Sequence, residues 1–328
     1  MPAWWGTGTQ YLLEPRRRAV AACVAVLAIA AVLMIPAFDS PAPVLDEGLL
    51  VSFPARLLDG ELPQRDFYDP YGPASVLTVA GAYEVFGESL QSERMVGMAY
   101  RLLIIAAAFG LALCWGLGAA LVGATIVAAT LVGSVGAPAS TGYWALALLG
   151  YALLARALLR PTPDSKLIPA AGVLLAASAL MRIDFLPSTV LAVIPTVLVI
   201  PKRDRKRFAA GVGVVLALLV FYVALAGPHS VWRSLQVGLG ARGKPERPPF
   251  ISDLAEIVTL YMLGTALLLG AGLLIERRLR RDPEARILLG VGIWGVAMAP
   301  FSLTKLDTPH VIISSTPVLA MLPVAALV

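Results

Sequence analysis

The sequence predicts an all-α integral membrane protein with about ten transmembrane helices, and three observations support this fold class. Hydrophobic residues make up 58% of the 328 residues, charged residues only 14%, and the mean hydropathy is +0.80. A soluble domain carries about 25% charged residues. The apolar segments lack the period-two alternation of a transmembrane β-barrel. The chain has only 2 cysteines, both within apolar runs, which excludes a disulfide-rich secreted module.

Ten apolar segments approach the roughly 17–25 residues that a membrane-spanning helix needs. They cover residues 19–37, 95–115, 117–137, 141–159, 167–182, 185–200, 208–226, 255–275, 287–303 and 311–328. We expect them to form one transmembrane domain, residues 1–328. The first segment follows three arginines, and its length favours a retained anchor over a cleaved signal peptide.

Four short basic tracts separate these segments and set the expected orientation. They hold 16 of the 26 Lys and Arg, and they are Arg16–Arg18, Arg156–Lys166, Lys202–Arg207 and Arg277–Arg286. Loops of this kind lie in the cytoplasm under the positive-inside rule. The net charge of +5 therefore indicates topology rather than binding to nucleic acid. Both ends of the chain are expected inside.

Residues 72–87 form an eleventh apolar stretch, but counting the crossings excludes it as a span. If Arg16–Arg18 lie inside, residues 39–69 lie outside. The chain must then cross the membrane an odd number of times before Arg156–Lys166. The three segments between residues 95 and 159 meet this condition, and a fourth would reverse it. We expect residues 72–87 to lie at the outer interface or to dip in without crossing.

The first outer loop, residues 38–94, contains nearly half of the acidic residues. Ten of the 21 Asp and Glu lie between Asp39 and Glu93, and glycines and prolines there indicate turns. A short amphipathic helix is expected near Glu47–Leu58. Aromatic residues alternate with carboxylates in the segment Asp66–Tyr71. This mixture favours a pocket for a polar ligand at the membrane surface over the alternative, a solvated acidic linker.

The adjacent acids Asp46 and Glu47 have two interpretations. Neighbouring side chains on a helix point about 100° apart, so both are not expected to face one ligand equally. One of them can act as a base while the other orients a partner. Alternatively, both stabilise the N-terminus of the helix, where negative charge is favourable. The sequence leaves both interpretations open.

Cationic residues gather near the outer ends of the predicted helices, although ionisable groups are costly in a membrane. Arg182 ends one segment, Arg101 lies two turns into a segment that begins at Arg94, and Lys305 and His310 share the last outer loop. Each could be an interfacial anchor whose charge reaches the lipid headgroups. Together on one face, they would suit an anion such as a lipid phosphate.

Motifs for several other chemistries are absent from the sequence. It contains no glycine-rich phosphate loop and no Cys-x-x-Cys or His-Glu-x-x-His motif, and its only histidines are His229 and His310. A histidine-based metal site is therefore not expected. His229 is interpreted as an interfacial residue at a helix end. No cofactor is implied, and a divalent cation has no support in the sequence.

The order of motifs resembles that of the GT-C class of multi-spanning glycosyltransferases, which includes protein O-mannosyltransferases, lipid A aminoarabinose transferases and actinobacterial arabinofuranosyltransferases. The first outer loop carries the resemblance through Asp46-Glu47-Gly48, Leu58-Asp59-Gly60-Glu61-Leu62-Pro63, Arg65-Asp66-Phe67, Tyr71-Gly72-Pro73, Phe86-Gly87 and Arg94. Leu180–Asp184 and Lys305–His310 look like further landmarks. The resemblance covers nearly the whole chain.

The resemblance implies an inverting hexosyl- or pentosyltransferase in a bacterial inner membrane, with a cytoplasmic N-terminus and an extracytoplasmic active site. Its donor would be a sugar linked to polyprenyl phosphate, and its acceptor an envelope glycan, a lipid or a protein. An acid of the first outer loop acts as base in such enzymes, and we expect Asp46 in this role. The expected substrate contacts are Glu47, Asp66, Tyr68, Asp69, Tyr71 and His310, and the expected lipid-phosphate contacts are Arg94, Arg182 and Lys305.

The sequence departs from the family pattern in two ways. Many relatives carry a second outer carboxylate before the span that matches residues 141–159, whereas residues 136–142 contain no acid. A second-carboxylate role or an Asp-based metal site is therefore in doubt. Relatives also often carry a C-terminal soluble domain, which we expect to be absent or truncated here.

Two other classes of function remain as alternatives. A transporter or lipid flippase would place ionisable residues near the middle of the bilayer and would show internal repeats. This sequence has its polar groups at helix ends and in one loop. A non-catalytic relative that binds lipid-linked glycans would keep the fold without turnover. Donor capture without transfer would distinguish it from an enzyme.

Overall fold

The computed structural model describes residues 16–40, 44–69, 71–132, 138–160, 164–241, 255–304 and 308–327, and this part of the chain is almost entirely helical. The α-helices are α2 (Arg16–Met34), α3 (Val44–Leu58), α4 (Pro73–Phe86), α5 (Leu90–Ala112), α6 (Leu117–Val132), α7 (Gly142–Leu158), α8 (Leu167–Met181), α9 (Leu186–Val197), α10 (Lys202–Ala226), α11 (Pro228–Ala241), α12 (Ala255–Arg278), α13 (Pro283–Thr304) and α14 (Thr308–Ala325). Short 3-10 turns are η2 (Ile35–Phe38), η3 (Leu113–Trp115), η4 (Ala139–Thr141) and η5 (Ile183–Phe185).

Each of the ten predicted apolar segments contains a helix. Six described helices are long and apolar enough to cross a membrane, and four more, in α6, α8, α9 and α14, are apolar but shorter than 18 residues. The all-helical prediction is confirmed for the described residues, whereas the count of ten spans stays a prediction. Two helices, α2 and α10, leave most of their apolar side chains exposed. Such surfaces are unfavourable in water and suit contact with lipid.

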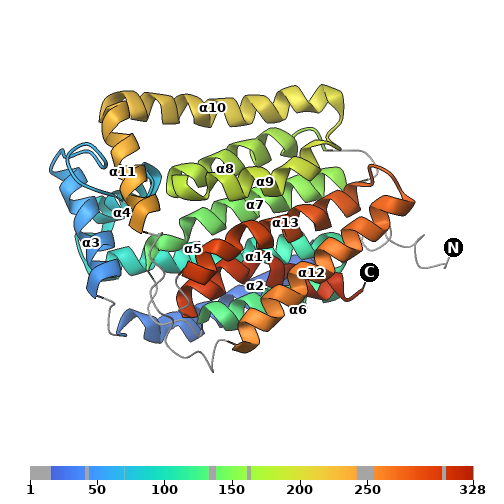
Figure 1. Ribbon diagram of the computed structural model, residues 1–328. Helices are drawn as coiled ribbons and strands as arrows, with labels where there is room; N and C mark the ends of the chain where they lie inside the picture. The colour runs from blue at the N-terminus through green and yellow to red at the C-terminus, as the bar shows by residue number, and fades with distance from the viewer. Residues whose placement is uncertain are drawn as a thin grey trace.

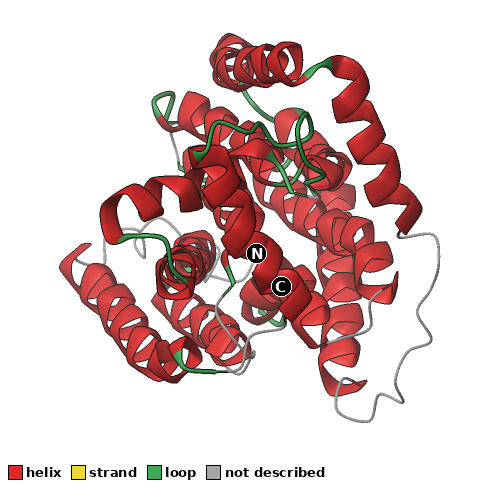
Figure 2. Cartoon of the chain, turned by 90° about the vertical axis from the view of Figure 1, so that its left-hand side faces the viewer, coloured by secondary structure: helices red, strands yellow, loops and turns green. Residues whose placement is uncertain are grey.

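The long helices run side by side in alternating directions, and the two ends of the bundle differ in character (Figure 1). The links that carry the four basic tracts all lie at one end. Helices α3, α4 and α11 gather at the other end, which Figure 2 views face-on with its loops crossing above the bundle. This grouping agrees with the orientation predicted from the basic tracts.

The first outer loop contains the two expected helices. α3 begins at Val44, three residues before the predicted start, and α4 contains 14 residues. Whether α4 enters the bilayer stays a prediction. α11 was not expected, since no apolar segment was predicted between residues 226 and 255. Gly227 has a φ of +87°, and α11 turns away from α10 at this point (Figure 1).

The core of the bundle centres on α7, which makes its most extensive contacts with α8 and α5. Tyr143, Trp144 and Tyr151 of α7 are fully buried, and Trp294 of α13 packs against both tyrosines. The buried hydroxyls are satisfied across helices. The hydroxyl of Tyr143 lies 2.8 Å from that of Thr189, and Tyr151 donates to the carbonyl of Ile287 at 3.1 Å. Hydrogen bonds of this kind hold helices together where water is absent.

Candidate functional site

The segment from Pro63 to Tyr71 forms a folded loop at the end of the bundle where α3, α4 and α11 gather. The Gln64 side chain donates to the Tyr71 carbonyl at 3.0 Å and so closes the loop on itself. Two other helices hold the loop from outside. Tyr222 of α10 donates to the Pro63 carbonyl at 2.6 Å, and the Ser234 hydroxyl of α11 lies 3.4 Å from the Asp69 carbonyl. The loop is therefore an ordered part of the fold.

Gly72 docks this loop on the C-terminal end of α8. Its N–H donates to the carbonyl of Met181 at 2.7 Å. A Cβ atom added at Gly72 would lie 2.0 Å from the carbonyl oxygen of Leu180. No side chain can fit at that distance, so only glycine permits this approach. The contact brings Asp69 and Tyr71 next to the residue that follows α8, Arg182.

Arg182 ends α8 with an extended backbone, φ −150° and ψ 94°, and its side chain is 11% exposed. Its guanidinium donates to both carboxylate oxygens of Asp184, at 2.9 and 3.3 Å. Its central carbon lies 4.2 Å from the ring centroid of Phe185, 5.2 Å from that of Tyr71 and 5.5 Å from that of Phe301. Three aromatic rings thus surround a cation at a distance that favours cation–π attraction.

His310 joins this cluster through Phe301. The rings of Phe301 and His310 have centroids 5.0 Å apart, and Phe301 packs against Phe185 at 4.7 Å. The hydroxyls of Ser302 and Ser314 lie 2.5 Å apart and join α13 to α14, while Ser314 also donates to the His310 carbonyl. These contacts place the predicted substrate ligand His310 near Arg182, although the two residues are far apart in the sequence.

The carboxyl of Asp69 is almost completely buried, at 2% exposure. Its Oδ1 accepts the N–H of Tyr71 at 2.9 Å. Burial raises the pKa of Asp69 to about 7, while the Tyr71 N–H and the nearby charge of Arg182 act in the opposite direction. Asp69 can therefore change its protonation state near neutral pH. A side chain with this property suits either hydrogen bonding to a ligand or proton transfer.

Glu47 and Arg94, predicted to bind sugar and lipid phosphate, instead form an ion pair with each other. Both side chains are 1% exposed. Arg94 donates to both oxygens of Glu47 at 2.8 and 3.2 Å, and to the carbonyls of Ala37, Phe38 and Ser40 at 2.5 to 3.1 Å. The pair fixes the first turn of α3 against α5 and the end of η2. These bonds occupy the atoms through which we expected both residues to bind substrate.

Two more ionisable residues of α5 lie beside this ion pair. Glu93 is fully buried, and its Oε1 accepts the N–H of Ala139 in η4 at 2.6 Å. Arg101 is 3% exposed and lies close enough to Glu47 and Glu93 to interact with their charges. Since residues 136–142 contain no acid, Glu93 is the carboxylate that contacts this link between α6 and α7.

Asp66 and Tyr68 lie on the exposed side of the same loop. Asp66 pairs with Arg65 at 2.7 Å and accepts the N–H of Leu62 at 2.7 Å. The hydrogen bond from Arg65 is the largest cause that lowers the pKa of Asp66. Tyr68 is 42% exposed. Both side chains are accessible to a molecule that approaches this face of the loop.

Two predicted site residues cannot be placed in full. Lys305 lies outside the described residues, and so does the side chain of Asp46, although its backbone belongs to the first turn of α3. Asp46 precedes Glu47 directly, so the Glu47–Arg94 pair restrains the backbone that carries it. Among the side chains that the structure describes, no group of three His, Cys, Asp or Glu is arranged to hold a metal ion.

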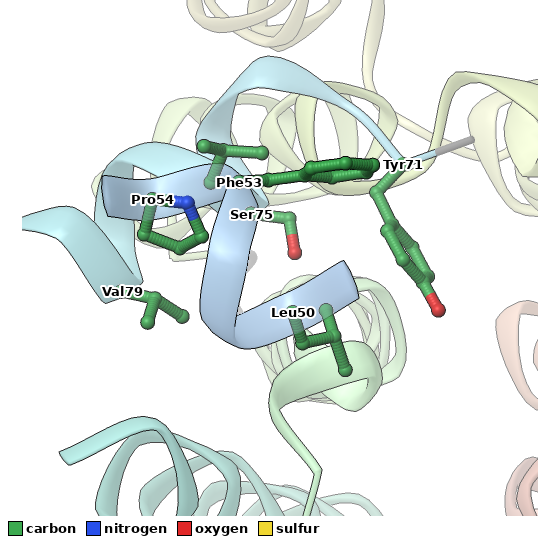
Figure 3. Close-up of a pocket in the computed structure, with 7 residues that line it drawn as sticks. Leu50, Phe53, Pro54, Tyr71, Ser75 and Val79 are labelled. Carbon is green, nitrogen blue, oxygen red and sulfur yellow. The ribbon is translucent and has the colours of Figure 1, made fainter. Parts of the chain in front are cut away.

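A small pocket lies between α3, α4 and the end of the loop (Figure 3). Its lining is almost wholly apolar and includes Phe53, Pro54 and Val79. The Tyr71 ring stands at the edge of the pocket across from Pro54, and the Ser75 hydroxyl is the polar side-chain group nearest its centre in this view. An apolar lining suits a hydrocarbon group better than a sugar. Tyr71 therefore borders both an apolar pocket and the Arg182 cluster.

Comparison with known proteins identifies the fold. No protein-family model and no curated protein matches the sequence. A crystal structure of ArnT from Cupriavidus metallidurans bound to undecaprenyl phosphate superposes with a TM-score of 0.61 at 19% identity, and the apo structure with 0.57 at 18%. The chain shares its fold with ArnT. The resemblance to the GT-C class, to which this aminoarabinose transferase belongs, is therefore confirmed at the level of the fold.

The match to ArnT includes nearly all of this chain but only part of ArnT. It covers 92% and 94% of this chain but 59% and 60% of the two ArnT chains. The chain thus spans about three fifths of the length of ArnT. An ArnT-like fold at this identity carries no information about individual catalytic residues, so the roles of the site residues stay predictions.

Three residues of this candidate site were missed by sequence reasoning. Phe185 follows the recognised Arg182–Asp184 motif directly, and an aromatic residue next to a helix-end arginine is the signal that could have indicated it. Phe301 and Glu93 gave no comparable signal. Phe301 lies in an apolar run, and Glu93 looked like one more acid of the outer loop.

Proposed function

We propose that the protein is a membrane glycosyltransferase that moves a sugar from a polyprenyl-phosphate donor to a hydroxyl acceptor at the end of the bundle that carries α3, α4 and α11. The ArnT-like fold, with a neighbour bound to undecaprenyl phosphate, is the observation that carries this proposal. In the orientation predicted from the basic tracts, this end is extracytoplasmic. The acceptor is an envelope glycan, a lipid or a protein.

Asp46 is the proposed base. It would accept the proton of the acceptor hydroxyl while the hydroxyl oxygen forms a bond to the anomeric carbon of the sugar. The bond from that carbon to the phosphate oxygen breaks, and polyprenyl phosphate leaves with the bonding electrons. Attack from the side opposite the phosphate inverts the configuration. Glu47 and Arg94 support this step as positioning residues, because their buried ion pair fixes the helical turn that carries Asp46.

Arg182 is the proposed contact for the phosphate, with Lys305 as a second cation. Negative charge grows on the phosphate as the sugar leaves, and a fixed guanidinium stabilises it without reorganisation of the site. The pairing with Asp184 and the ring of Phe185 fix the plane of the guanidinium. Tyr71 and His310 border the same cluster and are the proposed contacts for the sugar.

The test of the base is Asp46→Asn in protein reconstituted in membranes with a polyprenyl-phosphate sugar and isolated envelope acceptors. We expect transfer to fall about 10²–10⁴-fold, the usual contribution of a general base. Asp59→Asn is the matched control, since it removes one negative charge from an exposed residue of the same loop. Transfer by the control should equal that of the wild type.

Other outcomes would point to another function. Unchanged transfer by Asp46→Asn would remove Asp46 as the base. Capture of the lipid-linked sugar without transfer by the wild type would indicate a non-catalytic binding protein. Movement of the intact lipid between leaflets would indicate a flippase. Mass spectrometry of lipids that co-purify with the protein identifies the donor sugar in each case.

A further inference from the structure

The protonation state of the buried Asp69 carboxyl has consequences for the proposed phosphate site. Oδ1 of Asp69 accepts a hydrogen bond from the Tyr71 N–H, while Oδ2 has no hydrogen-bond partner among the described residues. Both oxygens are removed from solvent, since the residue is 2% exposed. An ionised carboxylate with an unsatisfied buried oxygen is unfavourable.

The polar groups that pack around Asp69 direct their hydrogen bonds elsewhere. Tyr222 of α10 donates to the Pro63 carbonyl, and Ser234 of α11 is directed at the carbonyl of Asp69 rather than at its carboxyl. Arg182, at the end of α8, acts on Asp69 through its charge, and it forms an ion pair with Asp184 at 2.9 Å. A second carboxylate is therefore not required to balance the charge of Arg182.

We propose that Asp69 is a neutral carboxylic acid in the resting protein and that its Oδ2 hydroxyl donates a hydrogen bond to the phosphate that Arg182 binds. This inference rests on the proposed function for the presence of a lipid phosphate. The sequence predicts Asp69 only as a substrate contact, and this inference assigns it to the phosphate. No covalent step is involved, and the proton stays on Asp69 during binding.

The proton matters because the ligand is an anion. A neutral Asp69 gives the phosphate oxygens a donor in a site with little water, where such bonds are strong. An ionised Asp69 would repel the phosphate and compete for Arg182. Removal of one proton therefore changes a favourable contact with the phosphate into an unfavourable one.

The direction of the pH dependence follows from this arrangement. The folded protein keeps Asp69 protonated up to about pH 7, because burial raises its pKa to about 7. Affinity for the phosphate should be complete below that pH and fall by up to about tenfold for each pH unit above it, as the competent fraction declines. A phosphate monoester loses its own second proton at about pH 6, which strengthens its binding to arginine as pH rises. The wild type must therefore be compared with a variant that cannot titrate.

The decisive variant is Asp69→Asn, with undecaprenyl phosphate as the probe and binding to the detergent-solubilised full chain measured between pH 6 and 8.5. An amide keeps the oxygen that accepts from Tyr71 and always carries donor hydrogens. We expect the affinity of Asp69→Asn for undecaprenyl phosphate to be within about threefold of the wild-type affinity at pH 6. At pH 8.5 the variant should bind more tightly than the wild type. Asp69→Ala should bind weakly throughout, and Asp59→Asn should follow the wild type.

Several results would overturn the proposal. One is a loss of binding in Asp69→Asn as large as that in Asp69→Ala, at equal thermal stability. A second is that the ratio of the wild-type affinity to the Asp69→Asn affinity does not change with pH. A third is that neither the wild type nor any variant binds undecaprenyl phosphate. Difference infrared spectra between pH 6 and 8.5 give a check that needs no ligand. At pH 6 the C=O band of a protonated acid should be stronger in the wild type than in Asp69→Asn, while any contribution from the buried Glu93 carboxyl is the same in both.

This experiment separates the inference from the proposed function. If binding of undecaprenyl phosphate depends on pH but no sugar is transferred, the role of Asp69 is supported and the proposed glycosyltransferase function is contradicted. Sugar transfer combined with infrared spectra that lack the Asp69 band would contradict the role of Asp69 alone.

Discussion

Arg94 and Arg182 lie at the same end of the bundle, and both were predicted to bind the lipid phosphate. Arg94 is 1% exposed and donates to the two oxygens of Glu47 and to three backbone carbonyls. Arg182 is 11% exposed, pairs with Asp184 and lies against the rings of Tyr71, Phe185 and Phe301.

The difference between the two arginines distinguishes a charge that stabilises the fold, Arg94, from one that is proposed to bind a ligand, Arg182. Aromatic faces attract a cation through its charge rather than through its individual N–H groups. Carbonyl and carboxylate acceptors, in contrast, use the N–H groups directly. We therefore expect substitutions of Arg94 to affect mainly stability and substitutions of Arg182 to affect mainly the donor. Three predictions test this difference.

The largest effect is expected for Arg94→Leu. The substitution leaves Glu47 buried without a partner, and breaking a buried ion pair in this way costs about 3–5 kcal/mol. Thermal unfolding in detergent should show a large decrease in midpoint. The double variant Glu47→Leu with Arg94→Leu removes both charges and should recover part of the loss. A double variant less stable than the single one would show that the unpaired charge is not the cause.

A smaller effect is expected for Gly72→Ala, which acts on the contact between the loop and Arg182. The added methyl group would lie 2.0 Å from the Leu180 carbonyl, so the loop must move away from α8. Strain of this kind costs about 1–3 kcal/mol. Sugar transfer should fall more steeply than the unfolding midpoint, because Asp69 and Tyr71 move with the loop. Gly81→Ala is the control, since its Cβ meets no atom within 4 Å; an equal loss of transfer in the control would contradict the docking role.

The smallest effect on stability is expected for Arg182→Lys. Lysine keeps the charge but loses the planar group that stacks on Phe185 and pairs with Asp184 through two nitrogens. We expect the KM for the lipid-linked donor to rise by about tenfold, a change of about 1.4 kcal/mol, with an unfolding midpoint close to the wild type. The exposed Arg233 of α11 provides the control, Arg233→Lys. A fall in midpoint without a change in KM would make Arg182 structural like Arg94.

Much of the fold could be predicted from the sequence because its signals are local. Every predicted apolar segment contains a helix, and α3 and α4 lie within the predicted outer loop. Apolar length and basic tracts act on each segment separately, so no knowledge of neighbours was needed. α11 was not predicted because its short, partly polar sequence resembles a loop. Packing next to the folded outer loop stabilises this helix, and a local sequence pattern does not show such packing.

The candidate site could be predicted only in part. Asp69, Tyr71, Arg182 and His310 were named from the sequence, and the structure brings them into one cluster. Glu47 and Arg94 were also named, but they are 47 residues apart and their mutual pairing cannot be read from either motif. Asp66 was also named, and it lies exposed with a hydrogen bond from its neighbour Arg65, so its substrate role stays a prediction.

The sequence by itself determined that this is a helical membrane protein whose polar groups gather at helix ends, because burying charge in lipid is too costly to allow another distribution. Tertiary structure alone decided which of those groups neutralise one another and which face a ligand. That choice depends on contacts between distant segments, such as Gly72 with the end of α8. The same contacts bury Asp69 next to Arg182 and so set the charge that a bound phosphate would meet.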